Sequence, residues 1–87
     1  MRNLEFDPGA FDDFVWWVRR DRKLALRILN LLEDVRRDPF QGIGKPEPLR
    51  GNLSGFWSRR IDDEHRIVYQ VREKVILIVS SRGHYKK

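Results

Sequence analysis

The chain contains no cysteine among its 87 residues and only two histidines. Without cysteine, neither a disulfide nor a thiolate-bound metal can hold the fold together, and the chain suits a reducing compartment. Apart from three consecutive acidic residues, Asp62, Asp63 and Glu64, the C-terminal half has no carboxylate cluster that would complete a metal-ligand set. A glycine-rich phosphate loop is missing as well. We therefore expect neither a metal nor a cofactor.

Long apolar runs are also missing. No segment approaches the length of about 20 apolar residues that a membrane-spanning helix needs, and the N-terminus lacks the apolar core of a secretory signal. We therefore predict a cytoplasmic protein without membrane contact. A hydrophobic content of 40% is too high for a disordered chain, and the length predicts a single domain over residues 1–87.

Positive charge is concentrated in the second half of the chain. The net charge is +5, yet residues 1–44 hold eight basic and eight acidic side chains, whereas residues 45–87 hold ten and five. Trp57 and Tyr85 are interleaved among these charges. A polyanionic partner is therefore expected to meet the C-terminal half, where phosphate contacts would supply most of the affinity. Charge and aromatic residues together favour nucleic acid over a merely soluble basic domain.

The N-terminal half predicts a strand and two helices. Alternation predicts a strand over Arg2–Phe6, and Asp7 and Pro8 then suit the start of a helix. Asp21 is expected to cap a second helix, which Pro39 ends, so that the two helices form an antiparallel hairpin. Apolar residues spaced by three and four positions should face the core: Phe11, Phe14, Val15 and Val18 in the first helix, and Leu24, Ile28, Leu31, Leu32 and Val35 in the second.

The C-terminal half predicts a loop and three strands. Glycine, proline and asparagine indicate a loop over residues 40–55. Strands are expected at Phe56–Ile61, His65–Arg72 and Val75–Ser80, with links short enough for antiparallel hairpins. The last strand is continuously apolar and should be buried on both faces. The element order predicts an α+β domain in which the helical hairpin packs on one face of a mostly antiparallel sheet.

Strand alternation separates the basic residues of the sheet into two faces. Arg60 points to one face and its neighbour Arg59 to the other, beside Trp57. Arg66 lies opposite the apolar residues of its own strand, which should look toward the helices. We therefore expect Arg66 on the open face, and if Arg60 points there too, two guanidinium groups converge. His65 falls on the core-facing side, where a structural role is expected.

Two stretches contain groups suited to RNA cleavage. Residues 45–69 read KPEPLRGNLSGFWSRRIDDEHRIVY, and residues 82–85 read RGHY. Glu47 stands between two prolines in the predicted loop, and His84 lies near the end of the chain. Carboxylate, guanidinium and imidazole are the groups that metal-free cleavage of RNA by its own 2′-hydroxyl needs.

These stretches, together with Asp38-Pro39-Phe40, resemble the YoeB-type toxins, ribosome-dependent mRNA endonucleases of the RelE superfamily from bacterial toxin–antitoxin pairs. The resemblance covers nearly the whole chain, from Phe11 to Tyr85, and a basic tail of Lys86 and Lys87 extends beyond its His-Tyr end. It implies a RelE-like fold and a type II toxin that cleaves translated mRNA in the ribosomal decoding site without a metal. The implied partners are mRNA, the ribosome and a YefM/Axe-like antitoxin, and a homodimer is compatible with the family.

The resemblance also implies roles for individual residues. Glu47 would be the general base, Arg66 would stabilise the phosphorane, and His84 would be the general acid. Three further residues would hold phosphates or stack a base: Arg50, Arg60 and Tyr85. Arg50 stands where a lysine is equally expected in the family.

Each of these residues also has an ordinary structural explanation. Glu47 can be a solvated loop charge, Arg66 can pair with Glu64 or Asp63, and Tyr85 can cover the sheet. Two other functions stay open. One is a toxin of the same fold that inhibits DNA gyrase and cleaves nothing. The other is a plain RNA- or ribosome-binding module, which would use the arginines and be indifferent to Glu47.

Overall fold

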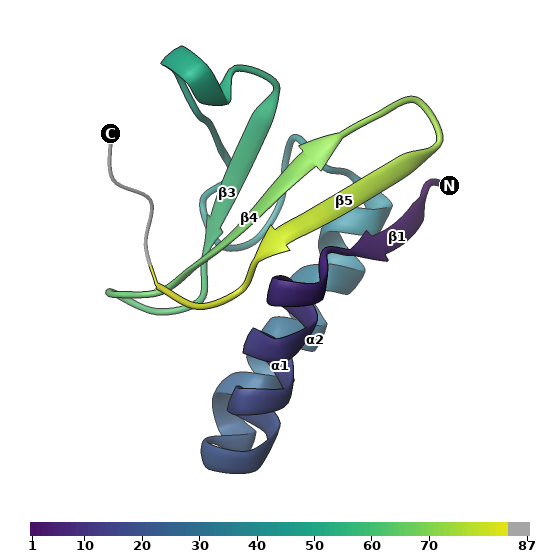
Figure 1. The fold of residues 1–87 in the computed structure, drawn as a ribbon. Helices are drawn as coiled ribbons and strands as arrows, with labels where there is room; N and C mark the ends of the chain where they lie inside the picture. Colours follow the sequence, from purple (N-terminus) through teal and green to yellow (C-terminus); the bar gives the residue numbers. More distant parts are fainter. Residues whose placement is uncertain (84–87) are drawn as a thin grey trace.

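The computed structural model describes residues 1–83, in which two α-helices lie on one face of a five-stranded sheet (Figure 1). The elements in chain order are β1 (Asn3–Phe6), α1 (Pro8–Arg20), α2 (Arg22–Arg37), β2 (Glu47–Pro48), the 3₁₀ helix η1 (Gly51–Leu53), β3 (Phe56–Arg60), β4 (Arg66–Val71) and β5 (Val75–Ser80). The strand order is β1-β5-β4-β3-β2, with β1 parallel to β5 and the other pairs antiparallel. This arrangement confirms the predicted α+β class.

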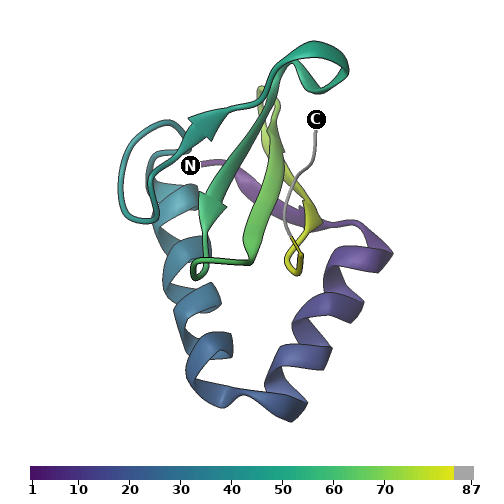
Figure 2. The same cartoon turned by 90° about the vertical axis from the view of Figure 1, so that its left-hand side faces the viewer.

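The helical hairpin forms because one residue serves both helices. The backbone N–H of Asp21 donates to Trp17 at the end of α1, and the Asp21 carboxylate accepts from the Leu24 N–H at the start of α2, as predicted. The turn lies at the end of the hairpin farthest from the sheet (Figure 2). Asp7 precedes α1, but its side chain makes no capping bond. Its N–H instead donates to Ile78 and so extends the pairing of β1 with β5.

The predicted core positions agree with the structure better in α2 than in α1. In α2 the predicted core positions are buried, except that Leu24 is half-buried and Ala25 is buried beside them. In α1 the prediction is partly wrong, because Phe11 and Val18 are 54% and 47% exposed. Ala10 and Trp17 are the buried residues of α1. The indole N–H of Trp17 donates to the carbonyl of Ser81, 2.8 Å away, which turns this face toward the end of β5.

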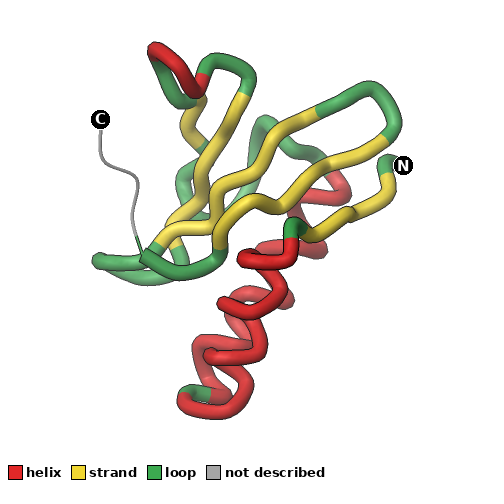
Figure 3. Tube along the Cα trace, viewed as in Figure 1, coloured by secondary structure: helices red, strands yellow, loops and turns green. Residues whose placement is uncertain are grey.

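The sheet has one covered face and one open face. Ile76 and Ile78 point toward the helices and are fully buried. Val75, Leu77 and Val79 point to the opposite face and are half-buried. The prediction that β5 is buried on both faces is therefore wrong, because both described helices lie on the same side of the sheet. Within the predicted loop, the structure adds β2 and η1 (Figure 3). None of the helices in residues 1–83 combines the length and apolar character needed to cross a membrane.

Candidate functional site

The open face of the sheet gathers a carboxylate and two guanidinium groups. Glu47 pairs with Ser58 across β2 and β3, and Arg60 pairs with Arg66 across β3 and β4. Paired residues on antiparallel strands point to the same face, and so do residues two positions apart on one strand. Glu47, Arg60 and Arg66 therefore share the face opposite the helices. Diagonal neighbours in such a sheet lie about 7–8 Å apart, within reach of long side chains.

Glu47 is held by backbone pairing and not only by its two flanking prolines. The segment that contains it is joined to β3 at both ends: the Arg60 N–H donates to Gly44, 2.7 Å away, and the Leu49 N–H donates to Phe56, 2.8 Å away. The prediction of a simple loop here is therefore incomplete. The side chain of Glu47 is exposed. The backbone is thus fixed while the carboxylate stays accessible to a substrate.

Glycine is required where this segment passes over the core. Gly44 has a φ of +80°, and a Cβ there would lie 2.7 Å from a methyl group of Leu31. Gly42 lies against the Asp34 carboxylate, which a Cβ would overlap. These close approaches bring the chain from the end of α2 to the start of β2 along one tightly packed path.

Arg66 is fixed by the turn that precedes it. Its NH1 group donates to the carbonyls of Asp62 and His65, at 2.8 and 3.1 Å, and the residue is half-buried. Among residues 1–83 it forms no ion pair with Glu64 or Asp63, so the surface-pairing explanation is not found. The guanidinium group is therefore oriented by backbone carbonyls, which leaves its charge available to an anion on the open face.

The turn itself is organised by the Asp62 carboxylate. Asp62 accepts hydrogen bonds from the backbone N–H groups of Glu64 and His65, at 2.9 and 2.7 Å. Burial raises the pKa of Asp62, but these two hydrogen bonds and the charge of Arg66 outweigh it, so the pKa lies below its usual value. An ionised Asp62 thus maintains the turn from which Arg66 extends.

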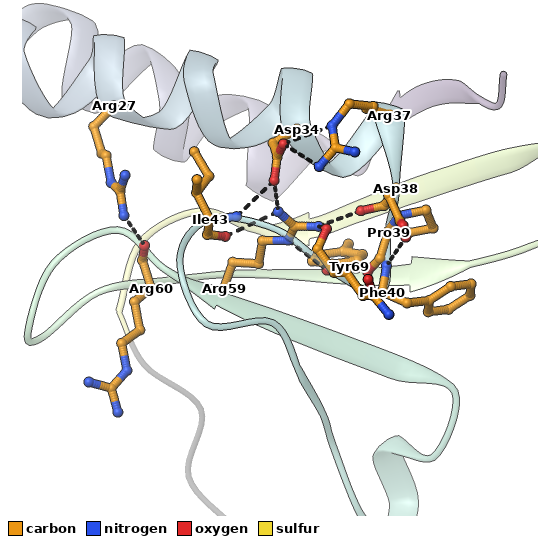
Figure 4. Close-up of polar contacts among 11 residues, drawn as sticks. Arg27, Asp34, Arg37, Asp38, Pro39, Phe40, Ile43, Arg59, Arg60 and Tyr69 are labelled. Atoms are coloured by element: carbon orange, nitrogen blue, oxygen red, sulfur yellow. Dashed lines mark hydrogen bonds and ion pairs between the residues drawn. The ribbon is translucent and has the colours of Figure 1, made fainter.

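Arg59 points the opposite way and is completely buried. Figure 4 shows its side chain directed toward α2, whereas the side chain of Arg60 points away from the helices. All five guanidinium N–H groups of Arg59 are used. Their acceptors are the Tyr69 hydroxyl, the Asp34 carboxylate, and three backbone carbonyls of the loop that follows α2: Asp38, Gln41 and Ile43.

The partners of Arg59 are themselves fixed. Burial raises the pKa of Asp34, but hydrogen bonds from the Ile43 N–H, Arg59 and Arg37 outweigh it and lower the pKa to about 2. The Tyr69 hydroxyl donates to the carbonyl of Pro39 at 2.7 Å, and burial is the main cause that raises the pKa of this phenol. The network therefore ties β3 and β4 to the segment that leads into Glu47.

Comparison with known proteins assigns this arrangement to a family. Residues 6–85 match the family model of the YoeB-like toxin of bacterial type II toxin–antitoxin systems. The chain belongs to the YoeB toxin family. It is 55% identical over 85 residues to Toxin YoeB of Mycobacterium bovis, a match that covers 98% of this chain and 100% of the relative. The resemblance inferred from the two stretches is thereby confirmed, and the chain is a toxin of a type II toxin–antitoxin system.

Two solved structures of YoeB proteins are similar along nearly their full length. A YoeB dimer from Staphylococcus aureus matches with a TM-score of 0.89 and 44% identity, covering 97% of this chain and 98% of the other. A heterotetrameric YoeB–YefM toxin–antitoxin complex from the same organism matches with a TM-score of 0.87 and 43% identity, covering 98% and 99%. The predicted YoeB-type fold is confirmed by these similarities.

The positions expected from the YoeB resemblance divide into two groups. Glu47, Arg60 and Arg66 lie together on the open face, and Arg50 is exposed at the start of η1. His84 and Tyr85 lie outside the described residues. Within residues 1–83, no group of three histidines or acidic residues is arranged to hold a metal ion.

Sequence reasoning did not assign a role to Arg59. Alternation predicts that it shares a face with Trp57 and Ile61 but leaves open which side this face lies on. In the structure this face looks toward the helices. An arginine on a core-facing strand position needs buried acceptors, and this was the signal available in the sequence. Its acceptors are distant along the chain, since Asp34 is separated from Arg59 by 25 positions.

Proposed function

We propose that this YoeB-family toxin is an endoribonuclease that cleaves translated mRNA in the decoding site of the ribosome by attack of the RNA's own 2′-hydroxyl. The observation that supports it most directly is the shared open face of Glu47, Arg60 and Arg66. A carboxylate beside two guanidinium groups combines a proton acceptor with fixed positive charge, which is the pairing that phosphodiester cleavage needs.

In the proposed reaction, Glu47 removes the proton from the 2′-hydroxyl as its oxygen attacks the adjacent phosphorus. Arg66 stabilises the negative charge of the phosphorane. Its guanidinium group is already oriented for this by its hydrogen bonds to two backbone carbonyls, before the substrate binds. The bond from phosphorus to the 5′ oxygen breaks, and His84 supplies the proton to that leaving oxygen. Arg50, Arg60 and Tyr85 hold phosphates or stack a base.

The proposed dependence on the ribosome has a physical reason, because Glu47 and the arginines are weak catalytic groups on their own. The exposed carboxylate stands on an open sheet face, where water competes with the substrate for both Glu47 and the arginines. An RNA that is already bent and held in the decoding site would bring its 2′-hydroxyl into line with the phosphorus, which can supply a large part of the barrier reduction. The same residues would therefore act slowly on free RNA.

We also propose an antitoxin as partner. A YoeB of similar fold and 43% identity forms a complex with the antitoxin YefM, and the charge excess of residues 45–87 would attract an acidic chain. The related Staphylococcus aureus YoeB forms a dimer, which supports a homodimer for this chain as well. An antitoxin that covers the open face would block Glu47, Arg60 and Arg66 together.

The products of cleavage test the proposal. The toxin, freed from its antitoxin, is incubated with programmed ribosomes, and the new RNA ends are analysed chemically. We expect a 5′-hydroxyl and a 2′,3′-cyclic or 3′-phosphate, cleavage within translated codons, and resistance of an mRNA with a 2′-deoxy sugar at the cut position. A 5′-phosphate would contradict 2′-hydroxyl attack. Binding without cleavage would favour the plain RNA- or ribosome-binding module, and inhibition of DNA gyrase without cleavage would favour the gyrase-type toxin.

A further inference from the structure

The end of β5 is anchored to α1 by three hydrogen bonds at a single residue. The Ser81 N–H donates to the Asp13 carboxylate at 3.1 Å, and its hydroxyl donates to the carbonyl of Ala10 at 3.1 Å. The carbonyl of Ser81 accepts the indole N–H of Trp17. Ser81 is buried, so these bonds are shielded from water. The chain therefore leaves the sheet from a fixed point.

Gly83, two residues later, is held on both of its peptide groups. Its N–H donates to Nδ1 of His65 at 2.8 Å, and its carbonyl accepts from the Arg66 N–H at 2.7 Å. The φ of Gly83 is +85°, a left-handed conformation that glycine adopts without strain. These two bonds connect Gly83 to His65 and to Arg66, the residue that would stabilise the phosphorane.

The ring of His65 is suited to this single contact. It packs edge-on against Trp17, with ring centroids 4.8 Å apart, and its side chain is 18% exposed. Because Nδ1 accepts a hydrogen bond, the N–H of the ring is assigned to Nε2. Nε2 faces the Glu64 carboxylate at 3.8 Å. The turn capped by Asp62 therefore fixes Arg66 through carbonyls and Gly83 through the His65 ring.

We propose that His65 is a positioning residue for RNA cleavage, which acts through Nδ1 by holding Gly83, the residue that precedes His84, beside Arg66. The inference rests on the proposed function, in which His84 protonates the leaving oxygen. Consecutive Cα atoms lie about 3.8 Å apart, so a fixed Gly83 restricts where the next residue can begin. A general acid must come within hydrogen-bond reach of its oxygen, and small displacements are costly for the rate.

Three substitutions separate the acceptor atom from the ring. His65→Phe keeps the ring against Trp17 but removes the acceptor. His65→Asn removes the ring but places an amide oxygen where Nδ1 stands, and His65→Gln places its oxygen one bond farther out, near the position of Nε2. Each toxin is produced with its antitoxin, freed from it, and compared with the parent in single-turnover cleavage on programmed ribosomes. Exchange of the Gly83 amide proton is followed by NMR, and thermal unfolding checks that each variant folds.

We expect His65→Phe and His65→Gln to slow the cleavage step about 10- to 100-fold, with the ribosome concentration for half-maximal rate unchanged. The Gly83 amide should exchange faster in both. His65→Asn should recover most of the lost rate and of the amide protection. A purely structural role would instead make the Asn variant the worst of the three, because it removes the contact with Trp17.

The possible failures can be told apart. If the parent cleaves and the Phe and Asn variants have equal rates, the positioning role is wrong while the proposed function stands. If Gly83 exchange is the same in the parent and the Phe variant, the hydrogen bond has no effect in solution, and the positioning role is again wrong. A parent that cleaves no RNA under any condition would overturn the proposed function, and the positioning role with it.

Discussion

Arg59 and Arg60 are neighbours on β3, yet the two faces of the sheet give them opposite surroundings. Arg59 is fully buried and donates all five of its N–H groups to oxygens of α2, the following loop and Tyr69. The side chain of Arg60 is exposed on the open face, opposite Arg66. The covered face uses a guanidinium group for structure, whereas the guanidinium groups of the open face are those proposed to bind an anionic partner.

The backbone of Arg60 connects the two faces. Its N–H donates to Gly44, and its carbonyl accepts from Arg27 of α2, at 3.3 Å. The segment that starts at Gly44 leads directly to Glu47. Substitutions on the covered face should therefore affect stability first and chemistry second, whereas substitutions on the open face should affect chemistry with little effect on stability.

The largest expected effect is that of Arg59→Ala. This substitution removes one of the donors to the Asp34 carboxylate and the side-chain donor to three loop carbonyls. Breaking a buried ion pair in this way costs about 3–5 kcal/mol. For a small domain, that is a large part of the total stability. We expect the variant to be largely unfolded and to lose both cleavage and antitoxin binding. Urea unfolding followed by tryptophan fluorescence measures the loss.

Arg60→Ala is the matched control for this comparison. It removes the same side chain one position along the strand, and an exposed substitution of this kind changes the free energy of unfolding by about 0.5 kcal/mol or less. Its effect should lie in RNA binding and in a weaker salt dependence. Equal losses of stability in the two variants would contradict the division between the faces. Arg59→Lys should be intermediate, because it keeps the charge and loses the planar fork.

Glu47→Gln tests the acidic residue of the open face. The amide has nearly the shape of the carboxylate but cannot take the 2′ proton, and loss of a general base costs about 10²–10⁴-fold in rate. We expect cleavage on programmed ribosomes to fall by this factor while ribosome binding and the unfolding midpoint stay near those of the parent. Glu73→Gln, on the β4–β5 link, makes the same charge change away from this site. If Glu47→Gln lowers binding as much as cleavage, Glu47 is a docking residue.

The sequence predicted the local features of the fold and missed those that depend on distant partners. Asp21 was recognised as a helix cap because the amide that it binds is three residues away. The exposure of Phe11 and of the outer face of β5 depends on what packs against them, which periodicity does not contain. The roles of Glu47, Arg66 and His84 came from the family resemblance. Strand alternation placed only Arg66 and, provisionally, Arg60 on the open face.

The smallest expected effect is the loss of stability in acid through Asp34, which binds Arg59 on the covered face. The pKa of Asp34 is lowered from 3.8 to about 2, so its ionised form stabilises the fold fully above the unfolded value. This contribution is lost as the pH falls through the range from about 4 to 2. Asp34→Asn removes the titrating group. The difference in unfolding free energy between parent and variant should therefore be largest near pH 6 and shrink by about 1–2 kcal/mol toward pH 2, since part of the side chain meets solvent.

Urea unfolding of both proteins at several pH values measures this difference directly. Asp62→Asn provides the control, because the pKa of Asp62 is also lowered but its carboxylate caps the turn before Arg66 and lies outside the Arg59 network. Asp62→Asn should lose cleavage through the displaced turn, whereas Asp34→Asn should lose stability first. A parent–variant difference for Asp34 that stays constant from pH 6 to pH 2 would show that its charge does not stabilise Arg59. The buried arginine would then be held by its carbonyl acceptors and Tyr69 alone.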